Sequence, residues 1–361
     1  MVERGTVILL EVVIFIALMD VLFALFVTPL TTTNTDEQTY PYSADIGLMV
    51  LFGFGLMAAY YERFSLTTLS MQLVTVCQCI ILYIFLEILW RSSSLGRLGF
   101  LELFNHNIIT MIFYTLTEAL IVDEALIFDT GRTMSLFSFA GTVSFLLSFA
   151  FKKDNEPVPP ARMPSTRGYV LALVGTGLCW VFFGSFNSAN AVGYQRTLAY
   201  ANTWFSLAMS TLTVFTLSYV IQGKLDPYTV IFSSLSGGIA IGCTADLIKS
   251  PSAALFIGIL AGLVVFMANW LNAFSRWSED STGLGNLSVV SGMVGSIMSC
   301  IIITFYRHDG GRPSEFDISF PRSFGVQAGF QFVGLIIAMC LGLACAAINY
   351  MLLFLTRSSY E

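Results

Sequence analysis

Apolar stretches long enough to cross a lipid bilayer recur about eleven times along this chain, with mostly short polar connections between them. A membrane-spanning helix needs roughly 20 mostly apolar residues because the hydrocarbon core is about 30 Å thick. The stretches at 253–274 and 325–355 meet this requirement. The sequence therefore predicts an all-α integral membrane protein, a polytopic helix bundle that forms a single domain over residues 1–361.

The composition excludes a water-soluble globular domain. Of the 361 residues, 56% are hydrophobic and only 11% are charged, and the mean hydropathy is +0.77. These values lie far from those of ordinary soluble domains. The net charge of -6 is spread thinly over the chain, without a basic block that could follow a nucleic-acid backbone. We therefore expect no nucleic-acid partner.

The cysteines and histidines give no sign of a metal or cofactor site. All seven cysteines fall within apolar stretches, which is typical of small core residues and not of a disulfide framework. Cys77 and Cys79 have one residue between them and no histidine nearby in the sequence, a poor arrangement for a metal site. Two histidines, His106 and His308, are too few to ligate several haems. We expect neither a cofactor nor a bound metal.

The apolar windows give the expected order of the spans. Predicted helices cover residues 6–29, 45–62, 68–90, 104–127, 133–151, 167–186, 197–221, 227–247, 252–274, 285–306 and 325–356. The true loops are 30–44, 152–166 and 307–324, which are rich in proline, glycine, hydroxyl groups or charge. Lysine and arginine in 152–166 favour the cytoplasmic side for that loop. An odd number of spans would place the two termini on opposite faces.

Several segments of the second half carry a family resemblance. The stretches are GTGLCWVFFGSFNSAN at 175–190, YANTWFSLAMSTLT at 200–213, SGGIAIGCTADLIKSP at 236–251, FIGILAGLV at 256–264 and QAGFQFVGL at 327–335. In this order and spacing they resemble the Rh branch of the ammonium transporter and Rh glycoprotein superfamily. DIGLMVLFGFGLMAAYYERFS at 45–65 is similar to the second helix of that family. The resemblance covers most of the chain and is strongest from 165 to 274.

The resemblance implies a channel and not an enzyme. Such proteins are trimers, each subunit holding its own pore between two halves of opposite orientation. Neutral NH3, and in some accounts CO2, crosses a narrow hydrophobic lumen after ammonium has lost its charge. The expected partners are membrane lipid, further copies or related subunits in a homo- or hetero-trimer, and a small neutral solute.

The family pattern also identifies candidate residues along the solute path. Each half of the family has an aspartate near a helix start and a pore-lining histidine eight positions later. Here DTGRTMSLF places Asp129 before Phe137, and DSTGLGNLS places Asp280 before Ser288, so both histidines are replaced. The inner gate phenylalanine of the family corresponds to Phe186. These five residues are the predicted path.

The two replacements change the expected chemistry. Paired imidazoles in mid-membrane can donate, accept and relay a proton. The phenyl ring of Phe137 has no acceptor, and the hydroxyl of Ser288 cannot take up a proton at neutral pH. By this interpretation the proton relay and much of the ammonium selectivity are missing.

The first half is also shorter than the family pattern. Between Arg63 and Glu118 there is too little chain for the three helices expected there, so one span is predicted to be missing near 88–104. That span carries the outer gate phenylalanine in the family. Its loss would leave the first-half wall of the pore incomplete and makes a collapsed or lipid-plugged lumen plausible.

Other polar residues have alternative interpretations. For Asp129 and Asp280 a helix N-cap is favoured over a cation site. Glu118 and Asp246 stand where the family also has acids, and structural roles at helix ends are favoured. His106 fits neither family histidine position and is expected to be a satisfied core or helix-end histidine.

The sequence leaves two candidate functions. The first is an Rh-type channel for NH3, CO2 or another small neutral solute, which rests on the resemblance and on Asp129, Phe186 and Asp280. The alternative is a non-conducting structural subunit of a larger membrane complex, which Phe137, Ser288 and the missing span favour.

Overall fold

The computed structural model describes residues 49, 100–150, 166–223, 227–275, 284–306 and 321–358, and most of them are helical. The α-helices are α6 (Phe100–Glu118), α7 (Phe139–Ala150), α8 (Thr166–Ser188), α9 (Tyr194–Gln222), α10 (Pro227–Ser233), α11 (Ser236–Ile241), α12 (Pro251–Ser275), α13 (Leu284–Thr304) and α14 (Phe324–Ser358). Two π-helical turns, η4 (Ala119–Glu124) and η5 (Thr133–Ser138), follow α6 and precede α7. The described residues contain no strand.

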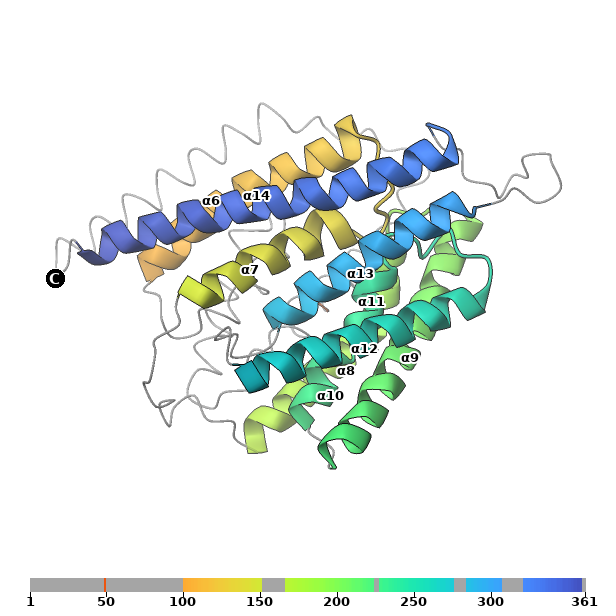
Figure 1. Ribbon diagram of the computed structural model, residues 1–361, viewed down its shortest axis with the longest axis horizontal. Helices are drawn as coiled ribbons and strands as arrows, with labels where there is room; N and C mark the ends of the chain where they lie inside the picture. Colours follow the sequence, from red (N-terminus) through yellow and green to blue (C-terminus); the bar gives the residue numbers. More distant parts are fainter. Residues whose placement is uncertain are drawn as a thin grey trace.

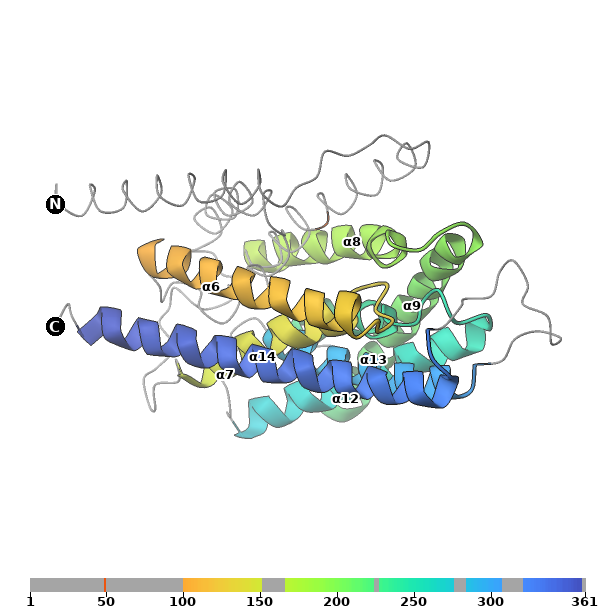
Figure 2. The same ribbon diagram turned by 90° about the horizontal axis from the view of Figure 1, so that it is seen from above.

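The long helices form a bundle with roughly aligned axes. Helix α14 packs along α6, α7 and α13, and α12 packs along α9 and α13 (Figure 1). Viewed from above, α8 and α12 lie on opposite sides of the bundle (Figure 2). Helix α13 contacts α7, α11, α12 and α14, so it lies at the centre of the described part of the fold.

Most predicted spans within the described residues are confirmed as helices. The windows 133–151, 167–186, 197–221, 252–274, 285–306 and 325–356 each coincide with helix to within a few residues. In the window 104–127 the α-helix ends at Glu118 and a π-helical turn continues to Glu124. The windows 6–29, 45–62 and 68–90 lie outside the described residues, apart from Met49, so the total of eleven spans stays a prediction.

One prediction was wrong in detail: the window 227–247 is not a continuous helix. It is divided into α10, α11 and a series of turns over 242–247. A broken helix leaves backbone carbonyls without intrahelical partners, and lipid cannot satisfy them. Mean apolarity over the window could not reveal the break, because apolar residues continue on both sides of the SSLSGG stretch.

Polar side chains of α9 donate hydrogen bonds to carbonyls of this broken segment. The hydroxyls of Ser210 and Ser206 donate to the carbonyls of Ser234 and Gly237 at 2.7 and 2.8 Å. The amide of Asn202 donates to the carbonyls of Ala245 and Ile248 at 2.8 and 2.7 Å. The polar residues of α9 therefore hold the broken segment in place.

Small residues let α9, α11 and α12 approach closely. A methyl group on Gly258 would lie 2.9 Å from the Cα atom of Ser206, and one on Gly262 would lie 2.8 Å from the carbonyl oxygen of Ser210. Such distances leave no room for a side chain. This is the packing expected for helices in lipid, where close backbone contact replaces the hydrophobic driving force.

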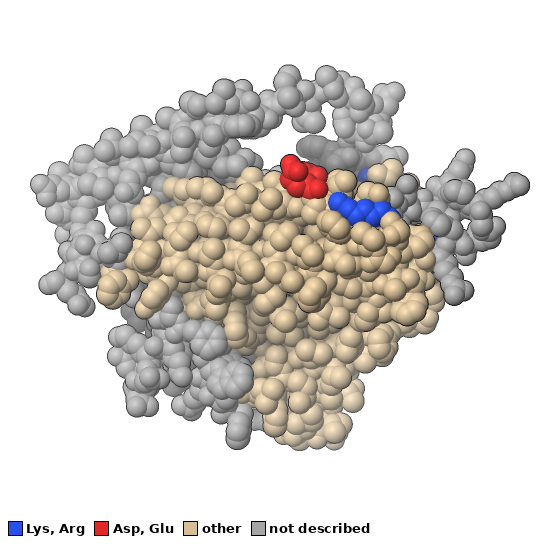
Figure 3. Space-filling view, turned by 45° about the horizontal axis from the view of Figure 1, so that its top comes forward, with Lys and Arg blue, Asp and Glu red and all other residues tan. Residues whose placement is uncertain are grey.

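The outer surface of the bundle is apolar. Within the described residues, α8, α9, α12, α13 and α14 are long and apolar enough to cross a membrane. Large apolar side chains are exposed along them, including Leu212, Ile301 and Leu343. One face shows charged side chains gathered at a single place, with the rest of its described surface uncharged (Figure 3). This pattern fits contact with lipid.

Candidate functional site

Three phenylalanine rings pack together where η5 meets α8. The rings of Phe137 and Phe183 stack with centroids 6.0 Å apart and planes 20° from parallel. Phe186 packs edge-on against both, with centroids 5.9 Å from each. Phe137 and Phe183 are completely buried, and Phe186 is 9% exposed. Two of the predicted path residues, Phe137 and Phe186, are thus brought together, and the three rings are called the Phe triad below.

Ser288 lies at the crossing of α7 and α13. It is completely buried, and its backbone packs against Gly141, one turn beyond Phe137. A methyl group on Gly141 would lie 2.8 Å from the carbonyl carbon of Ser288. Farther along the same crossing, Gly292 packs against Ser138. The helices that carry Phe137 and Ser288 are therefore in direct backbone contact beside the Phe triad.

Asp129 holds the start of η5. Its carboxylate accepts hydrogen bonds from the backbone N–H of Met134 at 3.1 Å and from the backbone N–H and the hydroxyl of Ser135 at 2.8 Å. The thiol of Cys243 also donates to it at 3.4 Å. A carboxylate that accepts the first N–H groups of a helix performs the capping function expected from the sequence, although Asp129 lies a few residues before the helix.

The connection 125–132, here named the strap, is fixed by hydrogen bonds to segments from several parts of the chain. Arg322 donates to the carbonyl of Ala125 at 2.8 Å, and Gln327 donates to the carbonyl of Leu126 at 3.0 Å. Leu126 itself has a positive φ of 47°. The start of the strap is therefore fixed to the beginning of α14.

The far end of the strap is fixed to the turn after α8 and to the turn after α11. Asn190 donates to the carbonyl of Thr130 at 3.1 Å, and the backbone N–H of Gly131 donates to the carbonyl of Gly242 at 2.9 Å. Gly131 and Gly242 approach so closely that a methyl group on Gly131 would lie 2.6 Å from the Cα atom of Gly242. Only a residue without a side chain fits at this contact.

Glu118 and Asp246 both contact the ends of this strap. Glu118 forms an ion pair with Arg132 at 2.8 Å. Asp246, in the turn between α11 and α12, accepts a hydrogen bond from the hydroxyl of Thr130 at 2.9 Å. Burial raises the pKa of the Asp246 carboxyl to about 6, and the hydrogen bond from Thr130 opposes this shift. Both acids thus have structural partners at helix ends.

His106 lies in the first half of α6, the helix that ends at Glu118, within a polar cluster between α6 and α14. It is 2% exposed, and its Nε2 atom is 3.1 Å from the hydroxyl of Thr110. On α14, Asn349 donates to the carbonyl of Cys345, and the Cys345 thiol is 3.8 Å from the Thr110 hydroxyl. The prediction of a core histidine is confirmed, and its Nε2 atom has a partner in Thr110.

Sequence reasoning missed two residues that organise the site. Phe183 completes the Phe triad, and it stands one helical turn before Phe186, a spacing that could have signalled a shared face. Asn187 donates to Thr203 and to the carbonyl of Gly238, tying α8 to α9 and α11. Asp280 lies outside the described residues. No group of three or more histidine, cysteine or acidic residues that could hold a metal occurs among the residues described.

Comparison with known proteins agrees with this arrangement. The profile of the Ammonium Transporter Family matches residues 8–361. Among curated proteins, Ammonium transporter Rh type B of Mus musculus is 26% identical over 353 residues, covering 85% of this chain and 77% of the relative. Ammonium transporter Rh type C of Oryctolagus cuniculus is 24% identical over 359 residues, covering 89% and 77%.

Solved structures share the fold. Nitrosomonas europaea Rh50, described as a member of the Rhesus family of channels, superposes with a TM-score of 0.69 at 20% identity, covering 87% of each chain. Saccharomyces cerevisiae Mep2 gives a TM-score of 0.69 at 15% identity, covering 85% of this chain and 82% of its own. With the profile match over nearly the whole length, these findings show that the chain is an integral, multi-pass membrane protein of the ammonium transporter family, within its Rh branch.

Proposed function

We propose that this protein is an Rh-type channel subunit that admits small uncharged molecules such as NH3 or CO2 and does not carry ammonium ion through a proton relay. Its curated relatives are named ammonium transporters, and the family profile covers nearly the whole chain. The retained Asp129 and Phe186 support a path in the family position.

The observation that carries the proposal is the Phe triad. If the path follows the family axis, it meets Phe137 where relatives have a histidine, and Phe137 is packed against Phe183 and Phe186. Three phenyl rings offer neither a proton acceptor nor a donor to water. An ion would lose its hydration there without replacement, a cost of several kcal/mol or more. A neutral molecule would pay far less and would need only a displacement of the rings.

The same observation favours a second candidate, the non-conducting structural subunit. The rings of Phe137 and Phe183 are completely buried, so in the described conformation the Phe triad would block a path that runs through it. If thermal motion does not separate the rings, the subunit serves only to assemble with related chains. Trimeric assembly is typical of the family and is compatible with both candidate functions.

Proteoliposomes separate the two candidates. Purified protein is reconstituted with an internal pH dye, and stopped-flow mixing imposes first an ammonia gradient and then a CO2 gradient with carbonic anhydrase inside. If the protein is a channel, the internal pH should change faster than in protein-free vesicles. It should change faster still with Phe183→Leu, which replaces one ring of the Phe triad by a smaller side chain. An electrode recording should show no ammonium current.

The control variant is Phe305→Leu, which changes a 76% exposed phenylalanine near the end of α13 and should leave flux unchanged. Flux equal to that of protein-free vesicles, for both the native chain and Phe183→Leu, would reject the channel and leave the structural subunit. A sustained ammonium current through the native chain would reject the sealing role of the Phe triad.

A further inference from the structure

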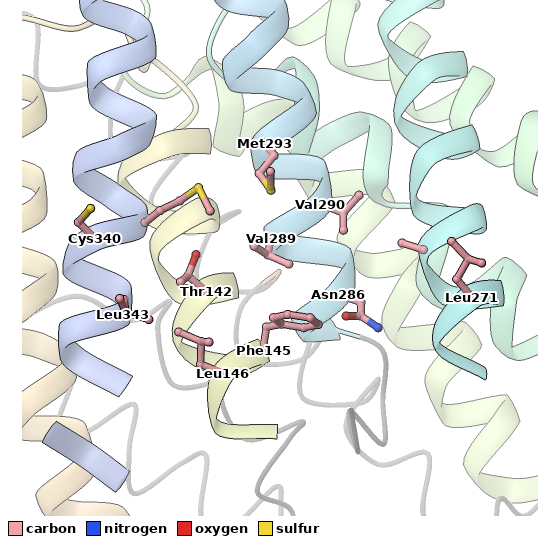
Figure 4. Close-up of a pocket in the computed structure, with 12 residues that line it drawn as sticks. Thr142, Phe145, Leu146, Leu271, Asn286, Val289, Val290, Met293, Cys340 and Leu343 are labelled. Carbon is pink, nitrogen blue, oxygen red and sulfur yellow. The ribbon is translucent and has the colours of Figure 1, made fainter. Parts of the chain in front are cut away.

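A cavity opens on the outer surface of the bundle, separate from the Phe triad. It has a volume of about 550 Å³ and lies between α12 and α14, with α7 and α13 as its floor (Figure 4). Ala268 and Leu271 line it from α12, and Cys340 and Leu343 line it from α14. We call it the α12–α14 groove.

The groove begins near one end of the bundle. Leu271 is near the end of α12, Leu146 is near the end of α7, and Asn286 is in the first turn of α13. From Asn286 to Met293 the floor runs seven residues along α13, which is about 10 Å at 1.5 Å per residue. The groove thus extends roughly a third of the way through a hydrocarbon core about 30 Å thick.

The lining is almost entirely apolar. Nine of its twelve residues are alanine, valine, leucine, methionine or phenylalanine, and the others are Thr142, Asn286 and Cys340. The Thr142 hydroxyl already donates to the carbonyl of Ser138 at 2.7 Å. Water needs two to four polar partners to occupy a buried site, and this lining does not provide them.

The rims of the groove continue into the surface that the spans present to lipid. Leu271 and Leu343 are 47% and 56% exposed on its two sides. Farther along, Ile297 on α13 and Ile336 on α14 are also exposed and apolar. The groove is therefore a recess in the lipid-facing surface of an integral membrane protein, and the bilayer that covers this surface is its natural source of ligand.

We propose that the α12–α14 groove binds one acyl chain of a membrane phospholipid. An acyl chain is narrow, flexible and apolar, and it regains the dispersion contacts that an empty recess would forfeit. A complete transmembrane helix is about 10–12 Å wide with its side chains and would rest on the rims without filling the recess between them.

The bound chain would support the helix crossing beside the proposed path. Val289 lines the groove, and its backbone, like that of Ser288, packs against Gly141 of α7. An acyl chain in the groove would therefore contact α7 and α13 together, beside their crossing at the level of Ser288. This inference does not depend on whether the subunit conducts.

Photoreactive lipid tests the proposal. The full chain is reconstituted with phosphatidylcholine that carries a diazirine in the middle of one acyl chain, irradiated, digested and analysed by mass spectrometry. Cross-links should concentrate on 286–293 and 339–343, and should exceed those at the equally apolar exposed positions Ile297 and Ile301 several-fold.

Two variants reduce the space in the groove. Leu343→Trp changes an exposed rim residue and should fold normally, and Ala268→Trp fills the groove from α12. Each should lower labelling of 286–293 several-fold. Ile259→Trp, on the same helix as Ala268 but outside the groove, should leave the labelling unchanged.

Three results would overturn the proposal. Labelling spread evenly over the exposed faces of α12, α13 and α14, unchanged in Leu343→Trp, would show ordinary surrounding lipid only. Cross-links from 286–293 to a second copy of the chain, in place of lipid, would show a subunit interface. Rapid modification of Cys340 by a membrane-impermeant maleimide added to both sides would show a water-filled groove.

Discussion

The ring of Phe137 stacks on that of Phe183 with their centroids 6.0 Å apart, and this contact joins the π-helical turn before α7 to the C-terminal part of α8. Stacked and edge-on arrangements at such distances are favourable, by about 0.5–1.5 kcal/mol per pair beyond the burial of area. With Phe186 the contact forms a closed set, in which each ring touches the other two. Changing one ring therefore affects the whole constriction.

Phe137→His should introduce ammonium-dependent proton movement. An imidazole at this position can accept and return a proton, which the phenyl ring cannot. General acid–base groups accelerate proton transfer by about 10²–10⁴-fold, so ammonium-driven flux in proteoliposomes should rise at least about tenfold over the native chain. The flux should also become dependent on pH near the histidine pKa.

The control for this substitution is Phe305→His, which places a histidine at a 76% exposed position directly after α13. It should leave flux at the native level. If Phe305→His and Phe137→His behave alike, Phe137 does not lie on the path.

The sequence predicted the helical framework well because apolar windows of bilayer length have few alternatives in lipid. It predicted the contact of Phe137 with Phe186 only indirectly, through the family pattern of the solute path. Phe183 was missed because the chain has 32 phenylalanines, and its one-turn spacing from Phe186 indicates a shared face but not which ring that face contacts. The break between α10 and α11 was missed because its hydrogen-bond donors, Ser206 and Ser210, belong to another helix.

Local backbone detail also escaped prediction. The position of Asp129 before Thr-Gly suggested an N-cap at a helix start, whereas the carboxylate reaches forward five and six residues into a π-helical turn. The strap depends on Arg322 and Gln327, which are about 200 positions away in the sequence. Contacts at that separation leave no periodic trace in a single sequence.

Gly141→Ala should destabilise the crossing of α7 and α13. The added methyl group would lie 2.7 Å from the Cα atom of Val289 and 2.8 Å from the carbonyl carbon of Ser288, so the helices would have to separate. Overpacking of this kind typically costs about 1–3 kcal/mol. Thermal unfolding in detergent, followed by loss of monodisperse protein, measures the effect.

Gly177→Ala is the matched control for the glycine substitution. Gly177 lies inside α8, and no heavy atom lies within 4 Å of a methyl group added there. Alanine is favoured over glycine in a helix interior by up to about 1 kcal/mol, so this variant should be neutral or slightly more stable. Equal losses in both variants would mean that Gly141 marks no close helix contact.

Asp129→Ala should destabilise the protein, and Asp129→Asn should do so much less. Alanine leaves the N–H groups of Met134 and Ser135 without their acceptor, whereas the amide oxygen of asparagine can take the place of Oδ2, which accepts from both N–H groups and from the Ser135 hydroxyl. Hydrogen bonds to a charged group contribute about 1.5–3 kcal/mol each, so the loss of thermal stability in the alanine variant should be large. If Asp129→Ala keeps full stability and only solute flux falls, Asp129 is a cation site and not a helix cap.

Asp246→Asn should stabilise the protein at neutral pH and have little effect in acid. Burial raises the pKa of this carboxyl from 3.8 to about 6. Between these two values the folded protein holds a proton that the unfolded chain has released, so native stability falls as the pH rises from about 4 to 6 and then stays constant. Asparagine keeps an oxygen for the Thr130 hydroxyl and carries no charge, so it removes this decline. The difference in unfolding temperature between Asp246→Asn and the native chain should therefore grow between pH 4 and pH 7. A difference that is independent of pH, or that shrinks over this range, would mean that the Asp246 carboxylate is better solvated or paired than its burial suggests.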